Sequence, residues 1–335
     1  MDSIPVVVLG GTGYVAGETL RLLASHPMFA MSAVVSESAS GQSVEEAFPH
    51  LCGMLGGAAF ASFDQLEEIV SRHGRLGVVS ALPHGASAEK IHAILEFAAA
   101  AGHEVKVVDL STDFRFPPEG SPFFCGLPDL EQETPDKHIA EPGCFTTAAT
   151  LATAPLVAGG WVVGDVVACG VTGSTGSGRT PKAGTHHPDR HSGMWAYEPV
   201  RHRHSREMKM LVSRHGSLDG FAFLPHSGPF ARGIHMTVTA RLAREASVDQ
   251  LVEFLHQFFS HTPFVSVSAK LPSVKEVVGT NRCHIGIAVE DGRVVVTSVI
   301  DNLTKGAAGG GVQWLNRLFG LPQETGLLNL GVGWN

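Results

Sequence analysis

The sequence has few charged residues, and its cysteines form neither a disulfide framework nor a thiolate metal site. Aspartate, glutamate, lysine and arginine make up 17% of the 335 residues, below the ~25% of an average soluble domain. The net charge of −8 argues against a general attraction to nucleic acid or to anionic membranes. The five cysteines are an odd number, lie far apart and include no CxxC pair, so we expect a reducing compartment, the cytoplasm.

Long hydrophobic runs and a targeting segment are also missing. No apolar run approaches the ~18 residues of a membrane-spanning helix, and the N-terminus leads into a strand-like run at residues 4–9 without a basic segment or a cleavage site. We therefore expect a soluble protein that is not exported. Hydrophobic residues make up 44% of the chain, enough for a large core, and the length suits two domains.

The first part of the chain has the pattern of a dinucleotide-binding βαβ unit. The β-branched run is followed by a glycine turn at residues 10–17, in which Gly11-x-Gly13-x-x-Ala16 fits the GxGxxG/A pattern, and then by apolar residues at helical spacing. Glycines give the tight turn and let backbone N–H groups approach a pyrophosphate. The alternation of strands and helices that follows predicts a parallel, doubly wound α/β sheet. These elements are expected at 31–35, 76–82, 86–101 and 105–110.

The loop after the second strand, residues 36–42, is where the adenosine ribose of a dinucleotide would be recognised. It contains Ser36, Glu37 and Ser38. An acidic residue there usually binds the 2′-hydroxyl of NAD, whereas hydroxyl groups favour the 2′-phosphate of NADP. The residues alone leave this choice open.

Two further loops, at 83–85 and 111–115, follow the next strands. Open α/β sheets bind ligands at the carboxyl ends of their strands, so both loops are candidates for binding. Ordinary turn chemistry is the alternative, and Asp113 with Arg115 can equally form an ion pair of little worth.

Cys144 is expected at the N-terminus of a helix. Pro142 and Gly143 interrupt the chain before it, and a run rich in Ala, Thr and Leu continues to about Ala158. Unpaired N–H groups and the positive end of the helix dipole stabilise a thiolate at such a position, which makes the cysteine a nucleophile. The alternative, which the residue type alone favours, is a buried structural cysteine.

The second half of the chain predicts an α+β domain with a mostly antiparallel sheet. A loop at 172–179, which ends in Arg179, offers hydroxyls, backbone N–H groups and a guanidinium to an oxyanion, with a flexible linker as the alternative. The histidines of 185–207 do not predict a metal site, because arginines among them repel a cation and no cysteine pair completes it. Strands are expected at 162–171, 221–226, 234–240 and in a hairpin around residues 291–292, and helices at 248–259 and 306–318.

The order of these motifs resembles the N-acetyl-γ-glutamyl-phosphate reductase family, the arginine-pathway branch of the aspartate-semialdehyde dehydrogenase superfamily. The resemblance covers nearly the whole chain. Departures from the family pattern are Glu141, Phe145 and Thr146, and a carboxylate at 141 would oppose formation of a thiolate unless it points away. The motifs that carry the resemblance are 10–17, 110–115, 126–129, 142–145, 173–179, 202–204, 232–234, 279–281 and 301–309.

The resemblance implies a fold and a set of site residues. It implies a Rossmann-type NADP-binding domain over 1–143, joined by the C-terminal segment 306–335, and an α+β catalytic and dimerisation domain over 144–305. Cys144 is then the nucleophile and His204 the acid/base, with His202 the next candidate. The residues implied to bind NADP(H) are Gly10, Thr12, Gly13, Tyr14, Val15, Ser36, Ser38, Pro83, Gly176 and Asn302. Those implied to bind substrate are Ser111, Arg115, Gly173, Ser174, Arg179, His202, Glu207 and Arg232.

The implied reaction is the NADPH-dependent reduction of N-acetyl-γ-glutamyl phosphate, in arginine biosynthesis, through a cysteine thioester. A thiolate expels phosphate from the acyl phosphate, and hydride transfer then takes the thioester to the aldehyde. An imidazole that titrates near neutral pH suits the proton transfers. The implied partners are the small acyl phosphate and further copies of the chain, as a dimer or a tetramer.

Three other functions stay open. One is the related reduction of a carrier-protein-bound aminoadipyl phosphate in lysine biosynthesis, which the residues 186–188 favour and Arg179 opposes. Its acidic carrier would need a basic patch on the surface. The others are a Cys–His hydrolase or acyltransferase that uses no nicotinamide, and a catalytically silent dinucleotide-binding sensor. The residues that would form the basic patch are Arg190, Arg201, Arg203 and Arg206.

Overall fold

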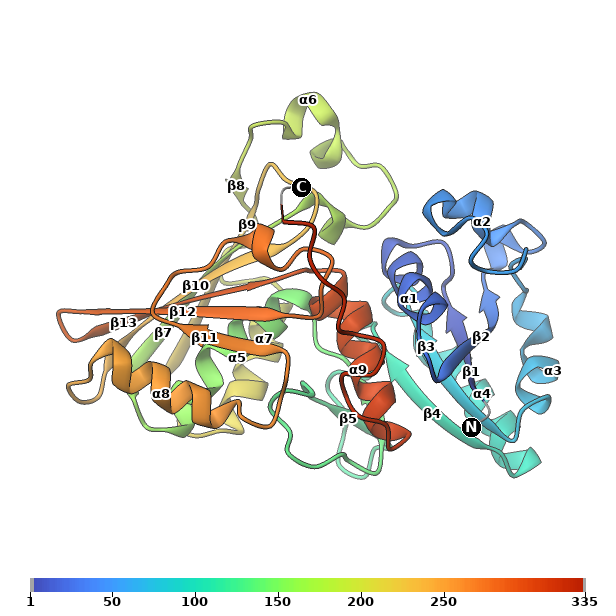
Figure 1. Ribbon diagram of the computed structural model, residues 1–335, viewed down its shortest axis with the longest axis horizontal. Helices are drawn as coiled ribbons and strands as arrows, with labels where there is room; N and C mark the ends of the chain where they lie inside the picture. Colours follow the sequence, from blue (N-terminus) through green and yellow to red (C-terminus); the bar gives the residue numbers. More distant parts are fainter. Residues whose placement is uncertain (1–2, 334–335) are drawn as a thin grey trace. The chain divides into compact units, whose positions relative to one another are not determined.

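The computed structural model describes residues 3–333, which divide into two compact units (Figure 1). Unit 1 contains the chain up to Gly126, Glu133–Glu141 and Ala307–Leu328. Unit 2 contains Leu127–Gln132, Pro142–Gly306 and the residues from Asn329 onward. The division differs from the boundaries predicted from sequence at 127–132, 142–143, 306 and 329–333, which lie in unit 2.

The short segment 127–132 belongs to unit 2 because of a buried carboxylate. Asp129 forms an ion pair with Lys305, and both side chains are buried. The hydroxyl of Thr262 also donates to Asp129, at 2.6 Å. A buried charge needs such partners, and these residues lie far along the chain, so sequence alone does not assign this segment.

Unit 1 is built on a six-stranded sheet in the order β2-β1-β3-β4-β6-β5. Every pair of neighbouring strands is parallel, which confirms the predicted doubly wound sheet. The strands are β1 Ile4–Leu9, β2 Phe29–Val35, β3 Arg75–Ser80, β4 Glu104–Asp109, β5 Phe123–Cys125 and β6 His138–Ala140.

Helices cover both faces of this sheet. On one face, the apolar residues of α3 and α4 pack with Val7 and Val78 in one cluster. On the other face α9 lies against β3, since a Cβ atom added to Gly77 would lie 3.1 Å from Leu315 and 3.3 Å from Phe319. The C-terminal helix is therefore part of unit 1. The helices are α1 Tyr14–Ala24, α2 Val44–Ala47, α3 Leu66–Ser71, α4 Ser87–Ala101 and α9 Gly309–Leu318.

Unit 2 is built on a seven-stranded mixed sheet in the order β11-β12-β13-β10-β7-β9-β8. The pairs β7–β9 and β11–β12 are parallel and the others antiparallel. Because β7 lies between β9 and β10, these two strands run in opposite directions without pairing. The predicted hairpin is confirmed, with Asp291 and Gly292 at φ 47° and 67°, as a two-residue turn requires. The strands are β7 Val162–Thr172, β8 Trp195–Ala196, β9 Gly220–Ser227, β10 Ile234–Leu242, β11 Val265–Ser268, β12 Cys283–Glu290 and β13 Arg293–Ile300.

The long helices of unit 2 lie on one side of its sheet (Figure 1). These are α5 Cys144–Ala158, α7 His204–Ser213 and α8 Val248–Phe258, while the short α6 spans His187–Arg190. Their apolar residues share one core cluster with every second residue of the central strands. The alternate residues of β7, β9 and β10 are mostly half-buried. Within residues 3–333, no helix is long and apolar enough to cross a membrane.

The imidazole of His26 ties the C-terminal segment to unit 1. Its Nε2 lies 3.1 Å from Oδ1 of Asn316 in α9 and 3.0 Å from the carbonyl oxygen of Thr325. Its Nδ1 accepts hydrogen bonds from the backbone N–H groups of Met28 and Phe29, at 3.2 and 2.9 Å. The ring is therefore neutral, with its proton on Nε2. Burial lowers the pKa of His26, against the opposing hydrogen bonds to Thr325 and Asn316.

We expect His26 to make the protein less stable in acid. A histidine whose pKa is lower in the folded state contributes stability above the unfolded pKa of ~6.5, and this contribution is lost as the pH falls. Urea unfolding at pH 7.5 and at pH 5.5 measures the loss. The His26→Gln variant should be less stable than wild type at pH 7.5 and should lose less on acidification, by on the order of 1 kcal/mol. Equal losses in both proteins would contradict this assignment.

Candidate active site

Cys144 is the first residue of α5, as predicted from the residues around it. Gly143 is the N-cap, with φ −69° and ψ 155°, and no side chain of its own caps the helix. The thiol is not part of a disulfide and is half-buried. The sulfur therefore lies at the positive end of a helix of 15 residues, which is the setting that favours a thiolate.

Two glycines allow close packing on the backbone around Cys144. A Cβ atom added to Gly143 would lie 2.1 Å from Nε2 of His204. A Cβ atom added to Gly306 would lie 2.6 Å from Cβ of Cys144 and 3.1 Å from its Cα. Such distances are too short for any side chain. The backbone of Cys144 is thus held between the π-helical turn that contains Gly306 and the imidazole of His204 beside Gly143.

The two candidate histidines differ in their surroundings. The ring of His202 packs among Phe145, Tyr197 and Phe223, with centroid distances of 5.6–5.8 Å, and its Nδ1 accepts the N–H of His204 at 3.2 Å. Burial lowers the pKa of His202, and the charge of Arg203 lowers it further. His204 begins α7 and lies against Gly143. His204 therefore packs on the residue that precedes Cys144, whereas His202 packs in an aromatic cluster.

Glu207 is placed one turn after His204 on α7. Its side chain is buried, and Oε2 accepts a hydrogen bond from the N–H of Gly143 at 2.9 Å and from the hydroxyl of Thr146 at 2.8 Å. This contact to the first turn of α5 was not predicted. The structure therefore brings together Cys144, His202, His204 and Glu207 from the predicted set.

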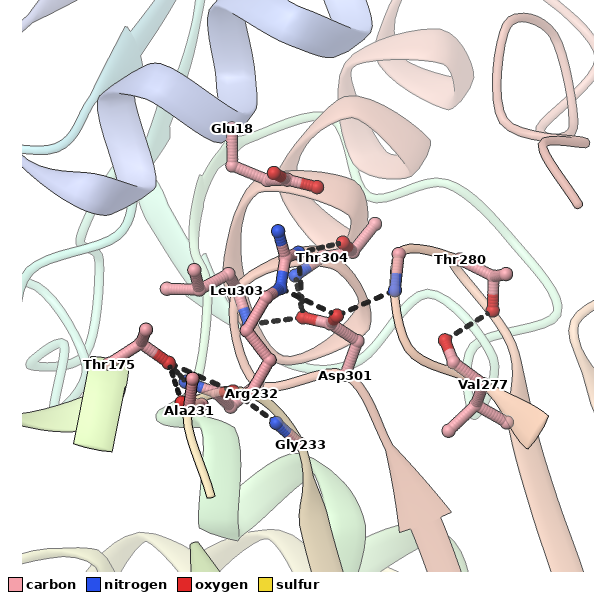
Figure 2. Close-up of polar contacts among 12 residues, drawn as sticks. Glu18, Thr175, Ala231, Arg232, Gly233, Val277, Thr280, Asp301, Leu303 and Thr304 are labelled. Carbon is pink, nitrogen blue, oxygen red and sulfur yellow. Dashed lines mark hydrogen bonds and ion pairs between the residues drawn. The ribbon is translucent and has the colours of Figure 1, made fainter. Parts of the chain in front are cut away.

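Asp301 follows β13 and is the centre of the polar network in Figure 2. Its carboxylate accepts two hydrogen bonds from Arg232, Nε at 2.9 Å and Nη2 at 3.0 Å, and further bonds from the N–H groups of Gly279, Leu303 and Thr304 at 2.7–3.0 Å. Its exposed fraction is 0%. One carboxylate therefore joins three loops of unit 2.

Asp301 also begins the turn that reaches Cys144. Its carbonyl oxygen accepts the N–H of Gly306 at 2.9 Å, the i to i+5 bond of the π-helix Thr304–Ala308. Within this turn Thr304 accepts a hydrogen bond from Arg232 at 3.0 Å and Lys305 pairs with Asp129. Short π-helical turns occur often at functional sites. No pattern in the sequence predicts this turn, because helix propensity does not distinguish α from π hydrogen bonding.

The loop after β7 is closed by backbone pairing with residues 230–233. The N–H groups of Gly173, Ser174 and Thr175 donate to the carbonyl oxygens of Gly233, Phe230 and Ala231 at 2.9–3.0 Å. The expectation that this loop offers its backbone N–H groups to an oxyanion is therefore wrong for these three residues. The pairing continues the contact of β7 with β10 beyond the strand ends.

Asn302 fixes the same loop through its side chain. Its Oδ1 accepts the N–H of Gly233 at 2.7 Å, and its Nδ2 donates to the hydroxyl of Thr175 at 3.0 Å. Gly176, also predicted at the site, lies nearby, since a Cβ atom added there would be 3.9 Å from Nδ2 of Asn302. Arg179 is exposed three residues further along.

The glycine turn of unit 1 lies between β1 and α1. Gly10 has φ 77° and faces the loop after β3, because a Cβ atom there would lie 2.6 Å from the carbonyl oxygen of Ala81. Gly13 is the N-cap of α1, with open space beside its Cα and no side-chain cap. The backbone at this helix N-terminus is thus accessible to a ligand, as a dinucleotide site requires. Of the other residues predicted here, Thr12 lies in the same turn, and Tyr14 and Val15 are the first two residues of α1.

The loop after β2 contains Ser36, Glu37 and Ser38, the residues that left the choice between NAD and NADP open in the sequence. The carboxylate of Glu37 accepts the N–H of Phe63 at 3.2 Å. The hydroxyls of Ser36 and Ser38 lie 3.4 Å apart at the end of the strand. Pro83, in the exposed loop after β3, completes the predicted cofactor residues of unit 1.

The polar residues after β4 mostly stabilise unit 1 itself. Asp113 accepts the N–H groups of Gly85, Ser87 and Ala88 at 2.7–3.1 Å and so caps α4. Arg115 donates from Nε and Nη2 to the carbonyl oxygens of Glu141 and Leu110, each at 2.9 Å. Asp113 and Arg115 therefore each bond backbone groups, and the ion pair suggested from the sequence does not form.

Ser111 is held by a buried carboxylate. Its hydroxyl donates to Oδ2 of Asp109 at 2.7 Å, and the hydroxyl of Ser87 donates to Oδ1 at 2.6 Å. Burial raises the pKa of Asp109, against these hydrogen bonds.

The basic surface patch suggested from sequence lacks one of its members. Arg190 is buried, donates to Ser227 Oγ at 2.6 Å and also bonds the carbonyl oxygen of Gly228. Arg201 and Arg203 are exposed and line an open hollow of about 800 Å³ with residues 198–200. Among the described residues, no group of three histidine, cysteine or acidic side chains is placed to hold a metal ion.

Sequence comparisons identify the family to which the chain belongs. A protein from Methanocella arvoryzae named N-acetyl-gamma-glutamyl-phosphate reductase is 33% identical over 98% of this chain and 99% of its own. One of the same name from Pseudomonas fluorescens is 37% identical over 98% and 99%. The chain belongs to the N-acetyl-gamma-glutamyl-phosphate reductase family. This confirms the resemblance that the motifs indicated.

Family models and solved structures identify the fold. A model described as semialdehyde dehydrogenase, NAD binding domain, matches residues 5–155, and one described as semialdehyde dehydrogenase, dimerisation domain, matches 144–302. Aspartate semialdehyde dehydrogenase II from Vibrio cholerae has a TM-score of 0.72 at 16% identity, covering 95% of this chain and 99% of that one. A second, from Candida albicans with NADP, has a TM-score of 0.65 at 17% identity, over 95% and 99%. The fold of the reductase family member is therefore that of these dehydrogenases.

We expect the Gly306→Ala variant to lose most of its reductase turnover. The added methyl group must displace the backbone of Cys144, and a misplacement of about 1 Å can cost about 10²-fold in rate. Steady-state turnover measures the loss, with thermal unfolding as a check that the variant folds. Gly74→Ala is the matched control, because the space beside Gly74 is open. Wild-type turnover in Gly306→Ala would show that the contact with Cys144 is irrelevant.

Proposed function

We propose that the protein reduces N-acetyl-γ-glutamyl phosphate to N-acetyl-glutamate γ-semialdehyde and phosphate, with NADPH as the reductant. The observation that carries this proposal is the position of Cys144 at the N-terminus of α5, with His204 packed on the preceding residue. The named relatives support the choice of substrate. Unit 1 then binds the dinucleotide and unit 2 carries the catalytic residues.

Cys144 carries the acyl group through the reaction. Its thiolate attacks the carbonyl carbon of the acyl phosphate, the bond from carbon to the phosphate oxygen breaks, and phosphate leaves with the electron pair. When bound, NADPH supplies the hydride that reduces the resulting thioester. The oxygen of the resulting thiohemiacetal then loses its proton as the bond from carbon to sulfur breaks, which releases the aldehyde and returns the thiolate.

His204 moves the proton at that oxygen. It donates the proton as the thioester carbonyl is reduced and accepts it again as the thiohemiacetal collapses, which an imidazole does well near neutral pH. We propose that N–H groups of the first turn of α5 donate to the oxygen on which negative charge develops. The N–H of Gly143 is not among them, because Glu207 accepts it.

Of the arginines implied to bind substrate, Arg179 is the one we assign to an anionic group. It is exposed in the loop after β7, and a guanidinium there can bind a carboxylate or phosphate in a bidentate manner. Arg115 and Arg232 instead hold backbone carbonyls and Asp301. We propose that Gly173, Ser174 and His202 shape the substrate pocket of unit 2 by their packing. Ser111, in unit 1, remains a prediction from the family resemblance.

NADP(H) is the cofactor we propose, bound at the glycine turn of unit 1. The position of Glu37 removes the main objection, because its carboxylate is held by the N–H of Phe63. The hydroxyls of Ser36 and Ser38 are then the groups that meet a 2′-phosphate. Gly176 and Asn302, which lie in unit 2, remain predictions from the family resemblance.

A carrier-bound aminoadipyl phosphate is the second candidate substrate. Arg201 and Arg203 favour it, because they are exposed beside an open hollow. The burial of Arg190 weakens it, since the basic patch for an acidic carrier is smaller than the sequence suggested. The acetylated small substrate is therefore preferred.

The proposal is tested by supplying each substrate to the purified protein. NADPH should be oxidised only when N-acetyl-γ-glutamyl phosphate is present, and NADH should be used less well. Cys144→Ser should lower turnover by on the order of 10⁴-fold or more while NADPH binding, followed by fluorescence titration, is unchanged. His204→Asn should slow both half-reactions by about 10²-fold.

Controls for this experiment come from the same chain. Cys52→Ser should react like wild type, because Cys52 is exposed and its role is not catalytic. A higher kcat/KM in the reverse direction for carrier-bound aminoadipate semialdehyde would reverse the choice of substrate. Turnover by Cys144→Ser, or a preference for NADH, would contradict the mechanism or the cofactor.

We further propose a cytoplasmic homo-oligomer that associates through the open face of the unit 2 sheet. The half-buried residues of β7, β9 and β10 on that face, Cys169 and Leu224 among them, are what a second copy would cover. The matched dimerisation model supports this. Sedimentation equilibrium should give at least twice the mass of one chain, and Leu224→Arg should give single chains. A wild-type protein that sediments as a single chain would refute the proposal.

A further inference from the structure

Glu207 lies on α7, the helix that begins with His204, and bonds to the start of α5, the helix that begins with Cys144. It lies three residues after His204 on α7, so the two side chains share one face of that helix. The exposed fraction of Glu207 is 1%. A carboxylate buried this deeply needs strong hydrogen-bond partners, which it finds on α5.

These partners flank the nucleophile on both sides. Oε2 of Glu207 accepts the N–H of Gly143, the residue before Cys144, at 2.9 Å, and the hydroxyl of Thr146, two residues after it, at 2.8 Å. Bonds to a charged acceptor are among the stronger ones in proteins. Two hydrogen bonds, made by the residues on either side of Cys144, therefore link the start of α5 to α7.

We infer that Glu207 is a positioning residue, which holds His204 against the start of α5 and keeps a negative charge beside Cys144 and His204. The inference rests on the proposed roles of those two residues and departs from the role in substrate binding that the resemblance implied for Glu207.

The chemistry of the substrate supports a positioning role. In the proposed substrate the amine is acetylated, so there is no cation for a carboxylate to bind, and the carboxylate and phosphate groups would be repelled. Glu207 is also already occupied by two donors on α5. Its negative charge instead acts on the groups beside it, opposing a thiolate at Cys144 and favouring an imidazolium at His204.

Other charged groups near Cys144 and His204 also shift the pKa values of their neighbours. Burial has the largest effect on the pKa of His202 and lowers it, and the charge of Arg203 lowers it further. The charges of Glu198 and Glu207 oppose this shift. Burial raises the pKa of Tyr197, and Cys144 raises it further, against Arg203 and Arg190. The charge of Glu207 is therefore best isolated by a substitution that removes it alone.

The Glu207→Gln variant removes the charge but keeps an oxygen that can accept both hydrogen bonds. Both limbs of the profile of kcat/KM against pH should move to lower pH by about one unit, because the thiol and the imidazolium then lose their protons more readily. The maximal kcat should fall by less than about tenfold and KM should change by less than about twofold. Glu207→Ala, which also removes the hydrogen bonds, should lose about 10²-fold in kcat with a similar KM.

A second readout separates this inference from the proposed function. The rate at which iodoacetamide alkylates Cys144 needs no substrate, and its midpoint pH should fall in Glu207→Gln whatever the natural acyl phosphate is. Glu253→Gln is the control, an exposed glutamate that bonds Gln257 on α8, and should leave both profiles unchanged. If Glu207→Ala does not fold, the Gln variant still decides the matter.

The contrary results are distinct. A KM raised more than about tenfold at unchanged kcat, in either variant, would make Glu207 a substrate ligand. An unmoved pH profile and alkylation midpoint in Glu207→Gln would reduce it to a purely structural contact. Failure of the proposed function would instead appear as turnover that survives in Cys144→Ser.

Discussion

The buried carboxylate of Asp301 is the interaction on which the arrangement of unit 2 depends. Removing a charge of this kind from water costs several kcal/mol unless it is fully paired, and here Arg232 and three backbone N–H groups pair it. The loops that supply these donors cannot separate without leaving the charge unpaired. The π-helical turn beginning at Asp301 is thereby fixed, and with it the contact between Gly306 and Cys144.

Cys144 is thus fixed from two directions by different kinds of contact. On one side a glycine without a side chain packs on its backbone. On the other, from α7, His204 packs on Gly143 and Glu207 bonds Gly143 and Thr146, the residues that flank it. Neither contact needs the substrate. A site whose groups are already in place loses little free energy to reorganisation when charge develops during the reaction.

Local signals in the sequence were enough to predict the main elements and the position of Cys144 at a helix N-terminus. Pro142 and Gly143 marked the start of α5, and the β-branched run before the glycine turn marked β1. Partners distant in the chain were not predictable in this way. Asp113 caps α4 and does not pair with Arg115, and the N–H groups of 173–175 bond to 230–233, because the fold places those acceptors there. The roles of these side chains follow from tertiary neighbours that no local pattern records.

The order of the units along the chain has a consequence for synthesis on the ribosome. Unit 1 is completed only by Ala307–Leu328, which follow nearly all of unit 2. Until this segment emerges, the apolar face of β3 around Gly77 lacks the cover of Leu315 and Phe319. Exposed apolar surface on a nascent chain invites aggregation and chaperone binding. Unit 1 is translated first, but it therefore cannot finish folding until Ala307–Leu328 has been synthesised. A truncation before residue 307 would leave unit 1, the part of the protein made earliest, incomplete.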